Sequence, residues 1–359
     1  MSSSHPRPLS EHGGWPAVLS TLIARRDLDP EVAEAAITEI LEGSATPSQM
    51  TAFIVALRAK GETATELAGM LRAVRTAGQR VDLPSDVAAR AIDIVGTGGD
   101  MSQSFNVSTL TAFVVAGAGV PVCKHGNRAA SSKCGAADLL EELGVAAELD
   151  PVGVAECVAE ANMGFCLAAR FHPAFRYTAP SRREIGISTA FNLLGPMANP
   201  AAIGSMLVGV AVPWMMRPMI EALGSRGVKS AWVVHGDGGV DEMTLAGPCR
   251  VLGLANGVIT EFSVDAADIG LAHAPLEAIR GGDAFENAAI ARSILGGARG
   301  AMRDTVVFNA AAALHIAGVA PSLVDGRGLA EESIDSGAAR VVLEKLVNSS
   351  NRAAQRLEQ

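Results

Sequence analysis

The chain has 359 residues, of which 49% are hydrophobic and 19% charged, and its formal net charge is −9. This length and composition predict a globular protein with one large domain and one smaller domain. Aromatic residues make up only 4% and the charge is acidic, so a nucleic-acid partner is not expected.

The cysteines and the N-terminus indicate the compartment. The five cysteines are odd in number and form no C-x-x-C pair; they are Cys123, Cys134, Cys157, Cys166 and Cys249. Such a set is typical of reduced thiols in a cytoplasmic protein. The N-terminal MSSSHPRPLSEHGGW lacks the apolar core of a signal peptide. No apolar run reaches the roughly 18 residues of a membrane helix, so no membrane partner is expected either.

The first part of the chain is predicted to be helical. Residues 1–14 read as a disordered lead-in of Ser, Pro, Gly and His. Residues 15–80 read as a small helical domain, because apolar positions recur at three- and four-residue spacing. Its helical segments are DPEVAEAAITEILEG, TPSQMTAFIVALRAKG and TATELAGMLRAVRTAG. Each ends at a glycine, as helices often do.

Residues 85–359 are predicted to form a large α/β domain with a central, mostly parallel sheet. Strand-like runs that end in polar loops are AIDIVGTGGD, VPVCKHGN, GFCLAARF and SAWVVHGDGG. Helical runs between them include AADLLEELG, PVGVAECVAEAN and MRPMIEALGSRG. This alternation is typical of a parallel sheet, whose ligands bind beyond the carboxyl ends of the strands.

The first candidate site is GTGGD, from Gly96 to Asp100, followed by SQSFNVST up to Thr109. Three glycines let backbone N–H groups approach an anion closely, and a helix beginning near Ser108 or Thr109 adds its positive end. The pattern is neither a Rossmann fingerprint, which needs glycine where Met101 stands, nor a Walker A loop. The alternative is a plain glycine turn with a helix-capping hydroxyl.

The second candidate site is KHGNRAASS, from Lys124 to Ser132, which follows an apolar run. Lys124 offers a point charge to a phosphate, and Gly126 permits close approach. Asn127 both donates and accepts hydrogen bonds, and Ser131 is a small donor. A solvated loop whose serines cap the next helix is the alternative, but the density of donors favours an anion site.

A third candidate is the adjacent acid pair Asp241 and Glu242, on a glycine-rich loop after SAWVVH. Carboxylate oxygens suit Mg²⁺, which usually shares its ligands with substrate phosphates. Asp237 either joins the pair or stabilises the turn. An exposed acidic turn is the alternative.

A fourth candidate lies in RREIGISTAFNLLGP, where Arg182 and Arg183 precede Glu184 and the run ends at Pro196. One arginine is expected to bind a carboxylate in bidentate fashion, and the other to form a surface ion pair with Glu184. His172 is expected to be structural.

No nucleophile motif is evident: there is no Ser-His-Asp order and no H-E-x-x-H, and Cys134 has no indicated partner base. Two anion loops, an acid pair and an arginine suit phosphoryl- or phosphoribosyl-group handling by positioning and electrostatics.

These motifs resemble a known family. GTGGD, NVST, KHGNRAASS, RREIG, FNLLGP and VDEMT occur in the order and at the spacing of anthranilate phosphoribosyltransferases, from about Trp15 to the chain end. The resemblance implies transfer of a phosphoribosyl group from phosphoribosyl pyrophosphate (PRPP) to the amine of anthranilate, in tryptophan biosynthesis. It also implies a fold like that of pyrimidine nucleoside phosphorylases, with the small domain completed by helices around 173–195, and a homodimer joined through the small domains.

The resemblance assigns roles to the matching residues. Those implied to bind PRPP are Gly96, Gly99, Asp100, Ser104, Asn106, Val107, Ser108, Thr109, Lys124, His125, Gly126, Asn127, Arg128, Ala129, Ala130, Ser131, Ser132 and Ala136. Those implied to bind anthranilate are Gly96, Asn127, Arg182 and Pro196. Mg²⁺, expected as two ions per subunit, is implied to be held by Ser108, Asp241 and Glu242. None is expected to act as an acid or base; Asn127 and Arg182 position the substrate.

The sequence departs from the family pattern at Met101, Cys134 and Ala136, where small, hydroxyl or glycine residues are usual. None of these changes removes a charge or a metal ligand. The rival activities are a pyrimidine nucleoside phosphorylase and a non-catalytic nucleic-acid-binding relative. The KHGNR and FNLLGP motifs argue against the first, and the acidic charge argues against the second.

Overall fold

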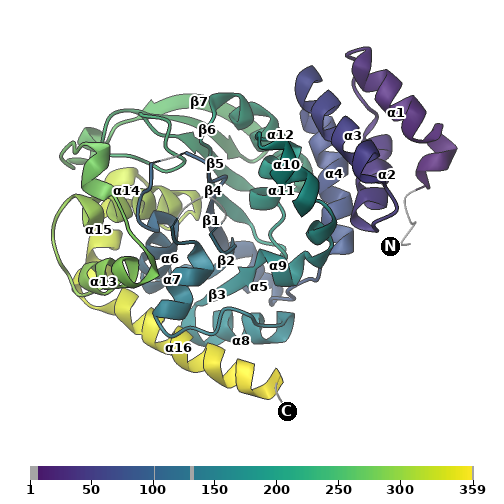
Figure 1. The fold of residues 1–359 in the computed structure, drawn as a ribbon. Helices are drawn as coiled ribbons and strands as arrows, with labels where there is room; N and C mark the ends of the chain where they lie inside the picture. The colour runs from purple at the N-terminus through teal and green to yellow at the C-terminus, as the bar shows by residue number, and fades with distance from the viewer. Residues whose placement is uncertain (1–6, 101, 130–132, 358–359) are drawn as a thin grey trace.

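The computed structural model describes residues 7–100, 102–129 and 133–357. A small helical lobe, purple in Figure 1, lies beside a larger α/β lobe that contains the only sheet of this described part. No helix in these ranges is long and apolar enough to cross a lipid bilayer.

The small lobe contains η1 (Leu9–His12), α1 (Gly14–Ile23), α2 (Pro30–Leu41), α3 (Pro47–Lys60) and α4 (Ala64–Ala77). Reciprocal capping fixes the starts of two helices: Thr46 and Gln49 cap α3, and Thr63 and Glu66 cap α4. Helix α4 approaches α2 so closely that a Cβ on Gly69 would lie 2.1 Å from the carbonyl oxygen of Pro30. The predicted helices are therefore confirmed.

The predicted disordered lead-in at residues 1–14 is wrong in its second half. Leu9–His12 form the 3₁₀ helix η1, and the side chain of Leu9 is 1% exposed. A single buried leucine in a polar stretch is enough to anchor the segment, because burial of one such side chain contributes about 2 kcal/mol. Residues 1–6 lie outside the described residues.

The large lobe is built on a seven-stranded sheet in the order β3-β2-β1-β4-β5-β6-β7. Its strands are β1 (Ile92–Gly96), β2 (Val122–Gly126), β3 (Met163–Leu167), β4 (Ser205–Gly209), β5 (Ser230–His235), β6 (Cys249–Ala255) and β7 (Val258–Val264). The first five run parallel, and β6 and β7 add an antiparallel hairpin at one edge. The mostly parallel sheet is confirmed, although β4, β6 and β7 were not among the predicted strands.

Helices cover both faces of this sheet (Figure 1). The helices of the large lobe are α5 (Ser85–Arg90), α6 (Val107–Gly117), α7 (Ala136–Glu142), α8 (Pro151–Ala161), α9 (Ala168–Phe171), α10 (Ala179–Ile185), α11 (Ala190–Met197), α12 (Met216–Arg226), α13 (Ala284–Leu295), α14 (Ala301–Ile316), α15 (Leu323–Asp335) and α16 (Ala338–Leu357). Four short 3₁₀ helices join them: η2 (Pro173–Tyr177), η3 (Pro213–Met215), η4 (Ala266–Ile269) and η5 (Leu276–Ile279). Helix α6 contacts β1, α14 and α16, whereas α12 contacts β5 and β6.

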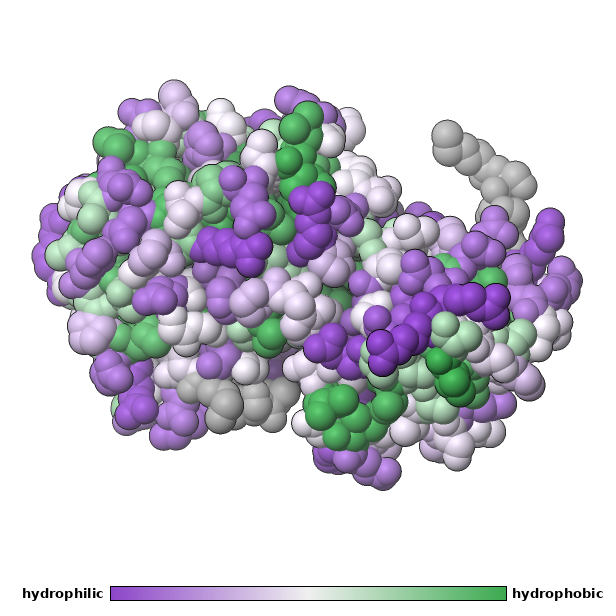
Figure 2. Space-filling view, turned by 90° about the horizontal axis from the view of Figure 1, so that it is seen from above, coloured by the Kyte–Doolittle hydropathy of each residue, from purple (hydrophilic) through white to green (hydrophobic). Residues whose placement is uncertain are grey.

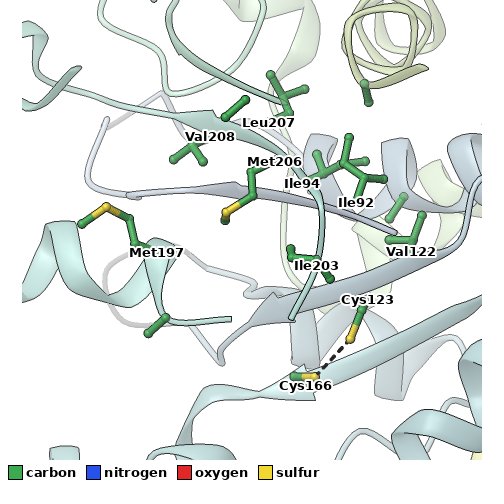
Figure 3. Close-up of a cluster of buried hydrophobic side chains, with 14 of the residues drawn as sticks. Ile92, Ile94, Val122, Cys123, Cys166, Met197, Ile203, Met206, Leu207 and Val208 are labelled. Carbon is green, nitrogen blue, oxygen red and sulfur yellow. Dashed lines mark hydrogen bonds between the residues drawn. The ribbon is translucent and has the colours of Figure 1, made fainter. Parts of the chain in front are cut away.

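The core lies between these helices and the central strands. Figure 3 shows Ile92 and Ile94 of β1 among apolar side chains of the neighbouring strands. The thiols of Cys123 and Cys166, on β2 and β3, are 3.7 Å apart. All five cysteines are buried and none of them forms a disulfide, so they pack as small apolar side chains.

Two helices after β3 connect the lobes. Helix α10 packs against α3, and α11 packs against α3 and α4. Helix α12 also contacts α4. The segment 173–197 therefore belongs to the large lobe in sequence but lies against the small lobe, and residues on α10 and α11 face the junction between the two.

Candidate active site

The loops that follow β1, β2 and β5 all leave the sheet at one edge, the carboxyl ends of the parallel strands. In sheets of this kind the ligand site lies at that edge. The structure brings the predicted glycine loop, Lys124 and the acid pair together there, although their positions in the sequence span more than a hundred residues.

The glycine loop after β1 is packed directly on the acid pair. The backbone N–H of Gly98 donates a hydrogen bond to Oδ2 of Asp241 at 2.7 Å. Gly98 and Gly99 have φ values of 67° and 78°, a region that favours glycine. These glycines are needed for the backbone shape, and without side chains they permit the close approach of an anion.

The acid pair is electrostatically unfavourable without a cation. Burial, and then the neighbouring Asp100 carboxyl, raises the pKa of Asp241 to about 7. Burial and the charge of Asp241 raise the pKa of Glu242 well above its usual range. Oδ2 of Asp100 is buried and accepts no hydrogen bond from the described residues. Several acceptor oxygens therefore converge at a place where positive charge would be stabilised.

These oxygens fit Mg²⁺ held partly by a substrate. Within the described residues, no group of three or more His, Cys, Asp and Glu side chains is arranged to hold a metal by itself. Mg²⁺ in phosphate-handling sites commonly takes only one or two carboxylates and completes its shell with water and phosphate oxygens. Asp241, Glu242 and the nearby hydroxyl of Ser108 match that pattern.

Helix α6 starts at this site, one residue before the predicted start. Its N-cap residue, Asn106, makes no capping hydrogen bond. Instead, Oδ1 of Asn106 accepts from Nδ2 of Asn287 at 2.9 Å, and its own Nδ2 donates to the carbonyl of Cys134 at 3.2 Å. The N–H of Val107 already donates to the Phe105 carbonyl at 2.7 Å, and no side chain caps the rest of the first turn, which suits an anion as phosphate-binding helix starts do.

The remaining residues near this helix start are backbone or packing positions. Ser104 forms an isolated bridge with Arg280. Val107 and Thr109 are buried, and the hydroxyl of Thr109 has no hydrogen-bond partner among the described residues. The role of Asn287 was not predicted, because its contact with Asn106 joins positions 181 residues apart.

Lys124 lies beneath the site rather than at its surface. Its side chain is buried, and Nζ donates to the carbonyl of Ile94 and to Oγ of Ser108, the latter at 3.2 Å. Burial lowers the pKa of the Lys124 ammonium, against the opposing charges of Asp93, Glu242 and Asp241. The ammonium balances these buried carboxylates and fixes Ser108 from below.

The loop after β2 is tied to helix α7. Oδ2 of Asp138 accepts hydrogen bonds from the backbone N–H groups of Ala129 and Gly135, at 2.9 and 2.8 Å. Asn127 is exposed at the loop entrance, and Ala136 begins α7. Ala130, Ser131 and Ser132 lie outside the described residues, as does Met101.

Arg128 points away from the acid pair. Its guanidinium makes two hydrogen bonds of 2.7 Å to the carboxylate of Glu141, and a third of 2.8 Å to Glu148. These partners raise the pKa of Arg128 above its ordinary value. In this arrangement the side chain anchors the loop to the surface of the large lobe.

Cys134 is not set up as a nucleophile. Burial raises the pKa of its thiol to about 11. The thiolate, which is the reactive form, is therefore scarce near neutral pH.

The junction of the lobes holds a cation with no counter-charge among the described residues. Arg182 on α10 is half-buried, and its guanidinium lies 5.4 Å from the ring centre of Phe191 on α11. Burial lowers its pKa. Among the described residues, neither Arg182 nor the exposed Arg183 forms an ion pair with Glu184, so the expected surface ion pair is not found. Arg182 is the better placed of the two to hold a bound carboxylate.

The predicted residues Gly96 and Pro196 lie on different elements. Gly96 ends β1 and lies against Asp241, whereas Pro196 is buried within α11, which packs against α3 and α4.

Two buried histidines, His125 on β2 and His172 just before η2, are in contact with each other. The rings of His125 and His172 meet edge to face, with centroids 5.2 Å apart. Nε2 of His172 is 2.9 Å from the carbonyl of Ala198. Burial lowers the pKa of His172 to about 4 and that of His125 well below its usual value. Both rings are therefore neutral at pH 7, which agrees with a structural role for His172.

Comparisons with known proteins identify relatives of both lobes. Residues 88–340 match the model described as "Glycosyl transferase family, a/b domain", and residues 16–78 match "Glycosyl transferase family, helical bundle domain". Anthranilate phosphoribosyltransferase from Rhizobium meliloti (strain 1021) is 48% identical over 335 residues, covering 93% of this chain and 98% of that protein.

Solved structures agree with this. The chain matches anthranilate phosphoribosyltransferase from Thermus thermophilus with a TM-score of 0.88 and 42% identity, covering 93% of this chain and 99% of that one. It matches the Saccharomyces cerevisiae enzyme in complex with PRPP and Mg with a TM-score of 0.85 and 28% identity, covering 96% and 99%. A third structure, of the yeast enzyme with 4-fluoroanthranilate, matches with a TM-score of 0.84 and 26% identity, covering 95% and 99%.

Proposed function

The chain belongs to the anthranilate phosphoribosyltransferase family, and from this we infer that it transfers the phosphoribosyl group of PRPP to the amine of anthranilate. The products are N-(5-phosphoribosyl)anthranilate and pyrophosphate, and the reaction is a step of tryptophan biosynthesis. The observation that carries this most directly is the glycine loop packed on the acid pair, where Gly98 donates to the buried Asp241 at 2.7 Å.

The donor is proposed to bind between the glycine loop, the start of α6 and the loop after β2. Backbone N–H groups of Gly99 and of the first turn of α6 suit the pyrophosphate oxygens. Asp241, Glu242 and Ser108 are proposed to hold two Mg²⁺ ions, and the yeast relative solved with PRPP and Mg supports the use of this metal. Mg²⁺ would supply the positive charge that the departing pyrophosphate needs.

The loop after β2 is proposed to close over the donor. Asn127, Arg128 and Ala129 belong to it, His125 and Gly126 at the end of β2 lead into it, and α7 begins after it at Ala136. Arg128 makes a bidentate pair with Glu141 and a further ion pair with Glu148 at the surface, which is a stronger arrangement than a single exposed pair. A phosphate would have to replace these carboxylates in order to bind the guanidinium.

Anthranilate is proposed to bind at the lobe junction. Arg182 is half-buried and makes no ion pair among the described residues, so the carboxylate of anthranilate would satisfy it. Asn127 and Pro196 would position the ring and the amine between Arg182 and the donor. The relative solved with 4-fluoroanthranilate supports an aromatic acceptor of this size.

The reaction proposed is a displacement at C1 of the ribose. The bond from C1 to the pyrophosphate oxygen breaks with its electron pair leaving on that oxygen, while the anthranilate nitrogen donates its lone pair to C1. The nitrogen then loses a proton. The aromatic amine is already a neutral nucleophile, and the buried His125 and His172 are neutral rings with lowered pKa values. Positioning and electrostatics therefore account for the rate.

A homodimer through the small lobe is also proposed. Apolar (green) patches are visible on the smaller lobe in Figure 2. Ile23 on the small lobe is 76% exposed and Val55 is 41% exposed, and Tyr177 and Ile187, on the segment that joins the lobes, are 42% and 55% exposed. Exposed apolar groups that gather on one part of a molecule commonly mark a protein interface. Sedimentation at micromolar concentration tests this, and a monomer would contradict it.

The activity is tested by the loss of anthranilate fluorescence. Loss that requires the protein, PRPP and Mg²⁺ together is expected, and omission of any one should abolish it. A parallel reaction with thymidine or uridine and phosphate measures phosphorolysis. Phosphorolysis without fluorescence loss, in folded protein, would contradict the proposed transferase and favour the phosphorylase activity.

A further inference from the structure

We propose that Asp93 and Asn199 are positioning residues that hold strands β1 and β2 apart beneath the donor site, so that the two loops that would bind PRPP face each other. Neither residue touches the proposed substrates. The inference rests on the proposed function, because it assigns these residues to the donor half of that reaction.

The first observation is that the pairing of β1 with β2 stops early. These strands share one register pair, Ile92 with Val122. By contrast, β1 shares five pairs with β4, and β2 shares five with β3. Strands β1 and β2 therefore stop pairing after one residue pair, although each strand continues for four more residues.

The second observation is that side chains replace the missing ladder. Ile92 N–H donates to the carbonyl of Pro121 at 3.0 Å, so the same register would pair Ile94 N–H with the Cys123 carbonyl and His125 N–H with the Ile94 carbonyl. Instead, His125 N–H donates to Oδ1 of Asp93 at 3.0 Å.

The two carbonyls of that missing step have side-chain donors as well. The Cys123 carbonyl accepts from Nδ2 of Asn199 at 2.7 Å, and the Ile94 carbonyl accepts from Nζ of Lys124. Three side chains therefore hydrogen-bond the backbone between the separated strands. The His125 N–H and the carbonyls of Cys123 and Ile94 all have a partner, so their burial carries no cost of an unsatisfied group.

The third observation is that Asn199 has its orientation fixed on all sides. Both hydrogens of Nδ2 are used, one by Oδ2 of Asp93 at 2.8 Å and one by the Cys123 carbonyl. Its Oδ1 accepts from Ala201 N–H at 2.8 Å. Arg226, the last residue of α12, donates to the carbonyls of Met197 and Asn199, which fixes this segment to the end of α12.

A role in packing alone does not explain this arrangement. Asp93 and Asn199 are both 0% exposed, and a buried carboxylate is usually less favourable than an apolar residue of similar size. An apolar residue at position 93 would leave His125 N–H to return to the ladder and bring β2 toward β1. The cost of the carboxylate is understandable if the separation of the strands is what the site requires.

The separation of β1 and β2 affects the two loops that are proposed to bind PRPP. The glycine loop leaves β1 at Gly96, three residues after Asp93, and the other loop leaves β2 at Gly126, next to His125. The distance between the two loops is therefore set by the hydrogen bonds of Asp93 and Asn199. The acceptor cation, Arg182, lies on α10 and shares no contact with this pair.

The test compares the KM for PRPP with the KM for anthranilate. Asn199→Ala and Asp93→Asn should each raise the KM for PRPP about tenfold or more, since each removes a buried hydrogen bond to a charged group. The KM for anthranilate should change less than about twofold. Binding of PRPP with Mg²⁺, measured by calorimetry without anthranilate, should weaken by the same factor as the KM.

A reciprocal exchange and a distant control sharpen the test. In Asp93→Asn/Asn199→Asp the new amide can donate to the new carboxylate, so part of the PRPP affinity should return. Ser350→Ala removes a buried hydroxyl on α16 that accepts from Ala146 N–H at 3.1 Å, and it should lower the melting temperature without changing either KM.

The outcomes separate this inference from the proposed function. If the wild-type protein shows no transfer, the proposed function fails first. If it is active, the inference is overturned by folded variants with an unchanged KM for PRPP, by equal rises in both KM values, or by a rise in Ser350→Ala. It is also overturned if every substitution at both positions unfolds the protein, because the role would then be structural.

Discussion

Gly96 and Asp241 fit together with no space for a side chain between them. A Cβ on Gly96 would lie 2.3 Å from Oδ2 of Asp241, the oxygen that already accepts a hydrogen bond from Gly98. The end of β1 therefore packs in direct contact with the Asp241 carboxylate of the loop after β5. Any displacement of one moves the other, and with it the proposed metal site.

Gly96→Ala should impair catalysis far more than stability. The added methyl group must push the Asp241 carboxylate away, and a shift of about 1 Å in a positioning group can cost about a hundredfold in kcat/KM. Steady-state kinetics at saturating Mg²⁺ measures this. Gly328→Ala is the matched control: it lies in α15 with nothing within 4 Å of the added Cβ, and it should add about 0.5–1 kcal/mol of stability at unchanged kcat/KM. Equal kinetics for the two variants would contradict the prediction.

Arg182→Ala should weaken anthranilate binding selectively. The loss of a charged hydrogen bond to the carboxylate costs about 1.5–3 kcal/mol, so the KM for anthranilate should rise about ten- to a hundredfold. Arg183→Ala removes the neighbouring exposed arginine and should change the same KM less than about twofold. If Arg183→Ala has the larger effect, the assignment of the acceptor cation is reversed.

The acid pair should control the requirement for Mg²⁺. Asp241→Asn and Glu242→Gln each remove one carboxylate charge, and the Mg²⁺ concentration at half-maximal rate should rise at least about tenfold. Rates titrated against free Mg²⁺ at saturating PRPP measure this. Asp237→Asn removes an exposed acid from the same loop and should leave the titration unchanged within about twofold. An unchanged Mg²⁺ titration in both acid-pair variants would defeat the metal assignment.

The sequence predicts the parts of this protein that depend on local order. Strand-loop-helix alternation locates β1, β2, β3 and β5, and the glycine and acid motifs mark their loops. Strand β7 is less evident, since an edge strand with an exposed face lacks a continuous apolar run, whereas β4 and β6 are mostly buried and were not predicted either.

What the sequence does not reveal are contacts between distant positions. Asn199 meets Asp93 across 106 residues, and Asn287 meets Asn106 across 181. The direction of a long side chain is equally hidden: Lys124 is turned beneath the site, and Arg128 toward Glu141, thirteen residues along the chain. A residue type and its position predict a candidate site, whereas the partners of each side chain depend on the fold.

His172 should make the protein less stable in mild acid. Burial holds its pKa at about 4, whereas in the unfolded chain the pKa is near 6.5. Between these values the unfolded chain binds a proton that the folded protein does not. This proton uptake stabilises the unfolded chain, so the free energy of unfolding decreases as the pH falls from 6.5 toward 4. Above pH 6.5 His172 is neutral in both states and the full stability is present.

His172→Phe removes this proton uptake. Relative to the variant, the wild-type protein should lose about 3 kcal/mol between pH 6.5 and 4, from 1.36 kcal/mol per pKa unit. At pH 8 the variant should be less stable by about 1 kcal/mol, because the hydrogen bond to the Ala198 carbonyl is lost. The raised pKa of Asp93, about 6, acts in the opposite direction but is present in both proteins, so it cancels in the difference. Urea unfolding at pH 8, 6.5, 5 and 4 measures the difference, and two parallel stability curves would show that His172 does not couple folding to protons.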